Sequence, residues 1–126
     1  MLVGVLAATP LAAQRTVKVS DGWVEMRDNG TAMAGATIEN GTMYEIYVTA
    51  AESEVAGEVA LAQAAGGQVT PVKELMVAAF DRLELTAQGP HVTLRQLKRP
   101  LKAGEKVTIQ LHTDAGERLP IEATVR

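Results

Sequence analysis

Imidazole and thioether side chains are the candidates for chemistry in this chain. The 126-residue sequence contains two histidines, five methionines and no cysteine. Imidazole nitrogen and thioether sulfur are ligands for transition-metal ions, and a useful site needs about three or four converging donors. His91 opens an alternating segment and shares its strand face with Thr93 and Arg95. His91 is therefore a candidate metal ligand, and a polar side chain on a solvated strand face is the simpler interpretation.

The other donors give further alternatives. A symmetric hairpin of the strands that flank residues 100–105 would place His91 opposite His112, which would form a two-histidine surface site for Cu(II) or Zn(II). A chain crossing between two sheets at this corner would instead separate the rings. The methionines show no close clustering and are typical of core or loop positions. Which of Met33, Met76 and His112 would act as a further ligand together with His91 stays open.

Hydrophobic periodicity of two residues predicts mostly strands from Thr16 onward. Residues 32–39 are predicted to form a strand that ends at Asn40-Gly41, a strong hairpin signal. The partner strand of this hairpin would have Tyr44, Ile46 and Val48 on one face. Further turns are expected at residues 28–30, 66–67, 88–90 and 114–116. Residues 106–113 alternate, with apolar side chains inward. Many short strands with frequent turns predict a β-sandwich or small barrel.

Two segments are ambiguous from periodicity alone. Apolar residues of segment 72–85 recur at helical spacing, which favours an amphipathic helix. The alanine-rich segment 55–65 has the same ambiguity, and Gly57 weakens its helical interpretation.

Composition and charge exclude some classes of function. A chain of this length forms one domain, and its 47% hydrophobic content is that of a globular protein. The net charge of −3 offers no basic surface for nucleic acid. Motifs of hydrolases, phosphate-binding loops and metalloproteases do not occur, so we do not expect an enzyme.

The first thirteen residues form an apolar run that ends in small residues. The run is too short to span a bilayer, and we predict that residues 1–13 are the remaining part of a signal peptide with cleavage near Ala13. A buried first strand is the alternative. Export to the periplasm or outside the cell agrees with the lack of cysteine.

Residues 89–107 resemble the signature region of the PCu(A)C family of periplasmic copper chaperones. They combine His91 with the corner Leu97-Lys98-Arg99-Pro100-Leu101-Lys102-Ala103-Gly104. Segments 21–24, 36–40, 48–51 and 56–61 resemble other strands of that family, and the resemblance runs from Val17 to the C-terminus. It implies one domain over residues 16–126 with an all-β, cupredoxin-like or immunoglobulin-like β-sandwich of Greek-key type. It also implies extended structure in segment 72–85.

The resemblance also implies a ligand set, which this chain retains only in part. The family places histidine and methionine ligands where this chain has Ala62, Ala64, Val69 and Thr93, so that His91 alone matches. Alanine and valine have no donor atom, and a hydroxyl is a hard ligand for Cu(I). The implied function is Cu(I) delivery towards a copper-accepting membrane oxidase or another copper chaperone, with a degenerate site. A β-sandwich protein-interaction module that binds no metal is the alternative.

Overall fold

The computed structural model describes residues 17–28 and 30–126, which contain ten strands. They are β1 (Val17–Met26), β2 (Ala32–Asn40), β3 (Ile46–Glu52), β4 (Ala56–Ala65), β5 (Gln68–Pro71), β6 (Leu75–Val77), β7 (Arg82–Glu84), β8 (Pro90–Leu97), β9 (Lys106–Thr113) and β10 (Arg118–Val125). Within these ranges, no helix has the length and apolar character needed to cross a membrane. The segment interpreted as part of a signal peptide, residues 1–13, lies outside the described residues.

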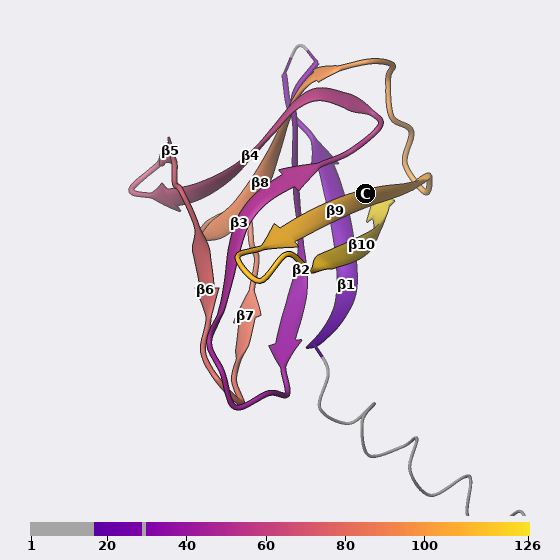
Figure 1. The fold of residues 1–126 in the computed structure, drawn as a ribbon. Coiled ribbons are helices and arrows are strands. Elements are labelled where there is room, and N and C mark those ends of the chain that lie inside the picture. The colour runs from indigo at the N-terminus through magenta and orange to yellow at the C-terminus, as the bar shows by residue number, and fades with distance from the viewer. Residues whose placement is uncertain (1–16, 29) are drawn as a thin grey trace, which may run out of the picture.

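The strands form one hydrogen-bonded sheet that rolls into two layers. Their order is β5-β4-β8-β2-β1-β10-β9-β3-β6, and β7 pairs with β2. Figure 1 shows β9 running across β2, and one apolar cluster joins side chains from both strands. Its fully buried members include Val24, Ile38, Val92, Leu94, Ile109 and Ile121. The predicted all-β sandwich is confirmed.

Strict alternation produces the inward faces of the sandwich. In β9, Val107, Ile109 and Leu111 are buried, as predicted, and the residues between them are more exposed. Successive side chains of a strand point to opposite faces, so a period of two sends every apolar residue to one side. Each such side chain contributes about 1.5–3 kcal/mol when fully buried.

Both ambiguous segments are extended. Residues 72–85 contain β6 and β7, and Ala56–Ala65 forms β4. Leu75 and Val77 are buried on either side of the exposed Met76, which is a strand pattern. Pairing of β6 with β3 and of β7 with β2 satisfies the backbone in this segment. Tertiary pairing therefore overrides the helical spacing of its apolar residues.

The hairpin predicted at Asn40-Gly41 is wrong. β2 pairs with β1, β7 and β8, whereas β3 pairs with β6 and β9. Asparagine and glycine favour many kinds of turn, so this dipeptide does not by itself indicate that the flanking strands pair. Here it lies where the chain passes from one part of the sheet to another. Tyr44, expected on the partner strand, is exposed before β3 begins.

The Asn40 side chain holds this crossing together. Asn40 is 2% exposed, and its Nδ2 donates to the carbonyl oxygens of Tyr44, Val77 and Ala78 at 2.7, 3.1 and 3.1 Å. Its Oδ1 accepts from the backbone N–H and the hydroxyl of Thr42 at 2.9 and 2.7 Å. One buried amide thus connects the loop after β2 with the loop after β6.

The corner between β8 and β9 carries the chain from one layer to the other. Leu101 is buried, and Gly104 has a φ of 88°, which favours glycine. Arg99 forms an ion pair with Glu105 across the corner. The Arg99 guanidinium, followed by the backbone N–H of Lys102, holds the pKa of the Glu105 carboxyl below its usual range. Since β8 and β9 do not pair, the two-histidine hairpin site does not form.

We expect Asn40→Ala to lower the free energy of unfolding by about 2–4 kcal/mol, because buried carbonyl oxygens lose their donor. Urea denaturation of both proteins measures this difference. Glu39→Ala, at the exposed neighbouring position of β2, is the control and should change stability little. Equal losses in the two variants would contradict the role given to Asn40.

Candidate functional site

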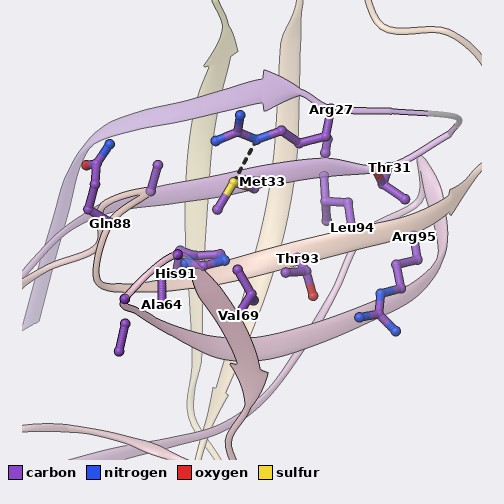
Figure 2. Close-up of a pocket in the computed structure, with 15 residues that line it drawn as sticks. Arg27, Thr31, Met33, Ala64, Val69, Gln88, His91, Thr93, Leu94 and Arg95 are labelled. Carbon is purple, nitrogen blue, oxygen red and sulfur yellow. Dashed lines mark hydrogen bonds between the residues drawn. The ribbon is translucent and has the colours of Figure 1, made fainter.

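A pocket of about 630 Å³ lies at the end of the sandwich where β1 turns into β2. The turn between β4 and β5 and the strand β8 complete its wall (Figure 2). Its lining is mainly apolar and small, with a few polar and charged side chains. The lining residues that carry the chemistry are Arg27, Met33, Ala64, Val69, His91, Thr93 and Arg95.

His91 is fully buried in the wall of this pocket. The interpretation of His91 as a polar residue on a solvated face is therefore wrong. β8 lies between β4 and β2, and Ala62 of β4 is the partner of His91 in register. Residues of the β4–β5 turn line the same pocket as His91. Alternation indicated the correct strand face, but it carries no information about what covers that face.

The His91 ring presents a free lone pair. Its Nδ1 lies 3.0 Å from the carbonyl oxygen of Gly89. A carbonyl oxygen only accepts, so Nδ1 carries a proton, and in the neutral imidazole the lone pair is then on Nε2. Nε2 is buried and has no hydrogen-bond partner among the described residues. A buried acceptor without a partner costs stability, which makes this atom a candidate for binding a ligand.

Met33 brings a thioether to the same pocket. It lies on β2 opposite Thr93 of β8 and is 7% exposed. Figure 2 shows its side chain between Arg27 and His91, with the sulfur above the His91 ring. Of the three replacement ligands considered from the sequence, Met33 is the one that lines the pocket with His91.

The other two replacement candidates lie elsewhere. Met76 is on β6, opposite Tyr47, and is 44% exposed. His112 is on β9, where its Nε2 lies 2.7 Å from a carboxylate oxygen of Glu52. Neither residue lines the pocket. The structure therefore does not bring Met76 or His112 to His91.

Sequence reasoning missed Arg27. Its Nε donates to the Met33 sulfur at 2.9 Å, and its Nη2 lies 3.9 Å from a carboxylate oxygen of Glu25. Glu25 of β1 pairs with Met33 of β2 in register. Arg27 follows two residues after Glu25, at the start of the turn between β1 and β2, and therefore lies near Met33. Pairing the strands on both sides of the predicted turn at residues 28–30 would have shown that Arg27 lies near Met33.

The pocket is electropositive. Arg27 and Arg95 line it, and no carboxylate does so within the part of the chain that the structure describes. A bound cation would therefore meet repulsion that its donor atoms must offset. Histidine, cysteine, aspartate and glutamate form no group of three or more that could hold a metal ion in residues 17–28 and 30–126.

Positions at which the family resemblance implied ligands lie close together in space. Ala64 and Val69 face each other in the β4–β5 register and line the pocket with His91 and Thr93. Ala62 is the register partner of His91. The Thr93 hydroxyl lies 3.4 Å from the carbonyl oxygen of Ala60 in β4, to which it donates.

Residues 17–125 match the model of a protein family described as "Putative lipoprotein LpqE-like". The chain is also similar to "Putative lipoprotein Lxx21020" of Leifsonia xyli subsp. xyli. The two are 27% identical over 125 residues, which cover 95% of this chain and 75% of that protein.

Solved structures share the fold. The Cu(I) form of DR1885 from Deinococcus radiodurans is 28% identical, with a TM-score of 0.75 over 94% of this chain and 85% of that one. The apo form of DR1885 is 31% identical, with a TM-score of 0.66 over 89% and 79%. The copper-bound PCuAC domain from PmoF2 is 14% identical and has a TM-score of 0.74 over 88% and 92%, a likeness of fold alone.

We expect long-range ¹H–¹⁵N correlation spectra at neutral pH to show His91 protonated at Nδ1 and unprotonated at Nε2, because only Nδ1 faces a carbonyl oxygen. His112 is the internal comparison, since its Nε2 faces the Glu52 carboxylate and should carry a proton. Protonation of His91 at Nε2 would contradict the assignment of the free lone pair.

Proposed function

Because this chain belongs to the LpqE-like family and has the fold of PCuAC domains, we propose that it is an exported copper chaperone-like protein that binds Cu(I) beside His91. The sequence resemblance to the PCu(A)C family is confirmed by these matches. The observation that carries the proposal is the buried Nε2 lone pair of His91, which shares a pocket with the Met33 thioether.

Two donors from the chain suit the cargo. Imidazole nitrogen and thioether sulfur are ligands that Cu(I) accepts, and neither needs to lose a proton in the tautomer described. Gly89 fixes the His91 ring through Nδ1, so the unprotonated nitrogen is ready for the metal. Thr93 is a hard donor and contributes little. In this proposal the site is degenerate, and Met33 on the neighbouring strand β2 takes the place of a lost sulfur ligand.

A two-donor site suits transfer. Cu(I) bound by two groups retains open coordination positions, and ligands of an acceptor protein can fill these positions before the carrier releases the ion. We therefore propose ligand exchange with a copper-accepting membrane oxidase or with another copper chaperone. The chain acts as a carrier in this proposal, without catalysis. An exported location, periplasmic or outside the cell, agrees with the family description as a lipoprotein.

A second candidate function is a protein-interaction module that binds no metal. The observation that favours it is the guanidinium of Arg27 on the Met33 sulfur, in a pocket lined by a second arginine. The two candidates differ in one measurable quantity, the affinity for Cu(I).

We expect the domain to bind one Cu(I) in competition with a chromophoric chelator, and His91→Leu and Met33→Leu each to weaken binding by about tenfold or more, since each removes a donor. Leucine is similar in size to methionine and histidine and has no polar atom to leave unpaired, so the fold should persist. Met76→Leu is the matched control, outside the pocket, and should bind as the unchanged protein does. Absence of Cu(I) binding would leave the second candidate.

We expect Thr93→Met to strengthen Cu(I) binding by about tenfold or more, because it adds a soft donor on the face that already presents His91. The same chelator competition measures the gain, and circular dichroism checks the fold. Unchanged affinity in a folded Thr93→Met variant would argue against this wall as the copper site.

A further inference from the structure

We infer that Arg27 is a gate on this pocket: its guanidinium donates a hydrogen bond to the Met33 sulfur and competes with Cu(I) for that donor. The inference rests on the proposed function and adds to it the regulation of the same site. It assigns Arg27 a regulatory role, since Arg27 affects Cu(I) binding by controlling the availability of the Met33 sulfur.

The contact between Arg27 and Met33 competes directly with a metal. Nε of Arg27 donates to the sulfur at 2.9 Å, and Met33 is nearly buried, so water has little access to that atom. A thioether accepts a hydrogen bond through the sulfur lone pairs that metal ligation also uses. Figure 2 shows the guanidinium and the His91 ring on opposite sides of the sulfur. The hydrogen bond engages one of the two sulfur lone pairs, so in the described arrangement the guanidinium competes with a metal for this donor.

Glu25 supplies a second place for the guanidinium. Its Oε1 lies 3.9 Å from Nη2 of Arg27, too far for a hydrogen bond but close enough for attraction. The other oxygen, Oε2, accepts from Nε of Arg126 at 2.9 Å, and Arg126 in turn lies over the Trp23 ring at 4.4 Å. Glu25 is thus held in place beside Arg27 and can take up its guanidinium.

Charge links the movement to loading. A Cu(I) ion bound to the Met33 sulfur would place a positive charge beside the Arg27 guanidinium, and these two like charges repel. Repulsion from the ion and attraction by Glu25 both favour displacement of Arg27. In the reverse direction, return of Arg27 to the sulfur would favour release of the ion.

Arg95 offers a matched control. It carries the same charge and lines the same pocket, and the structure gives it no hydrogen bond to Met33. Arg27→Ala and Arg95→Ala therefore remove equal charge, but only Arg27→Ala frees the sulfur. Both arginines are exposed in large part, so both variants should fold.

The test measures Cu(I) affinity of the unchanged protein and both variants by chelator competition, and the methyl ¹³C shift of Met33 without copper. We expect Arg27→Ala to bind Cu(I) roughly threefold to tenfold more tightly, the factor that one net hydrogen bond represents. Arg95→Ala should gain less. The Met33 methyl resonance should move in Arg27→Ala and stay in place in Arg95→Ala.

Each other outcome contradicts a specific statement. Equal gains in the two variants would show that bulk charge matters, and would overturn the gate while leaving the proposed function. An unchanged Met33 resonance in Arg27→Ala would overturn the contact itself. Absence of binding in all three proteins would overturn the proposed function and the gate together. Binding in Arg27→Ala alone would support the gate in its strongest form.

Discussion

The position of β8 between β4 and β2 is the constraint on which the pocket depends. A strand paired on both sides must place alternate residues either in the sandwich core or on the opposite face. Val92 and Leu94 take the core, which forces His91 and Thr93 to the other side. There the β4–β5 turn and the start of β2 close over them. Burial of His91 thus follows from strand order, and its free lone pair follows from the Gly89 carbonyl beside Nδ1.

Much of the fold could be predicted because its signals are local. Alternation in residues 106–113 indicated β9 and its inward face, and the Gly66-Gly67 turn joins β4 to β5, with both glycines at positive φ. The crossing after Asn40 could not be predicted from the dipeptide, because turn residues specify a local bend and leave the choice of partner strand to distant pairing. The buried Asn40 side chain, which donates to three carbonyl oxygens and accepts two hydrogen bonds from Thr42, stabilises the crossing that this pairing requires.

The site was predictable in position but not in composition. The family resemblance indicated positions 62, 64, 69 and 93 around His91. Residues 64, 69 and 93 line one pocket with His91, whereas Ala62 is its register partner on β4 and is not among the lining residues. Selection of Met33 over Met76 requires the β2–β8 register, since spacing in the sequence treats the two methionines alike. The type and spacing of Arg27 gave no signal, because a single arginine beside a turn is ordinary on a protein surface, and only the strand register across the turn at residues 28–30 brings it close to Met33. Its meaning comes from one contact with the Met33 sulfur.

The small number of donors and the neighbouring guanidinium both lower the affinity of the proposed site for Cu(I). Each missing ligand weakens the hold on Cu(I), and each positive charge in the pocket raises the energy of the bound ion. A storage protein would be poorly served by such a site. A carrier has a different requirement, because its affinity must lie below that of the acceptor for transfer to proceed. The proposed Cu(I) site would meet that requirement, since the imidazole offers the ion a free nitrogen while the guanidinium competes with it for the thioether.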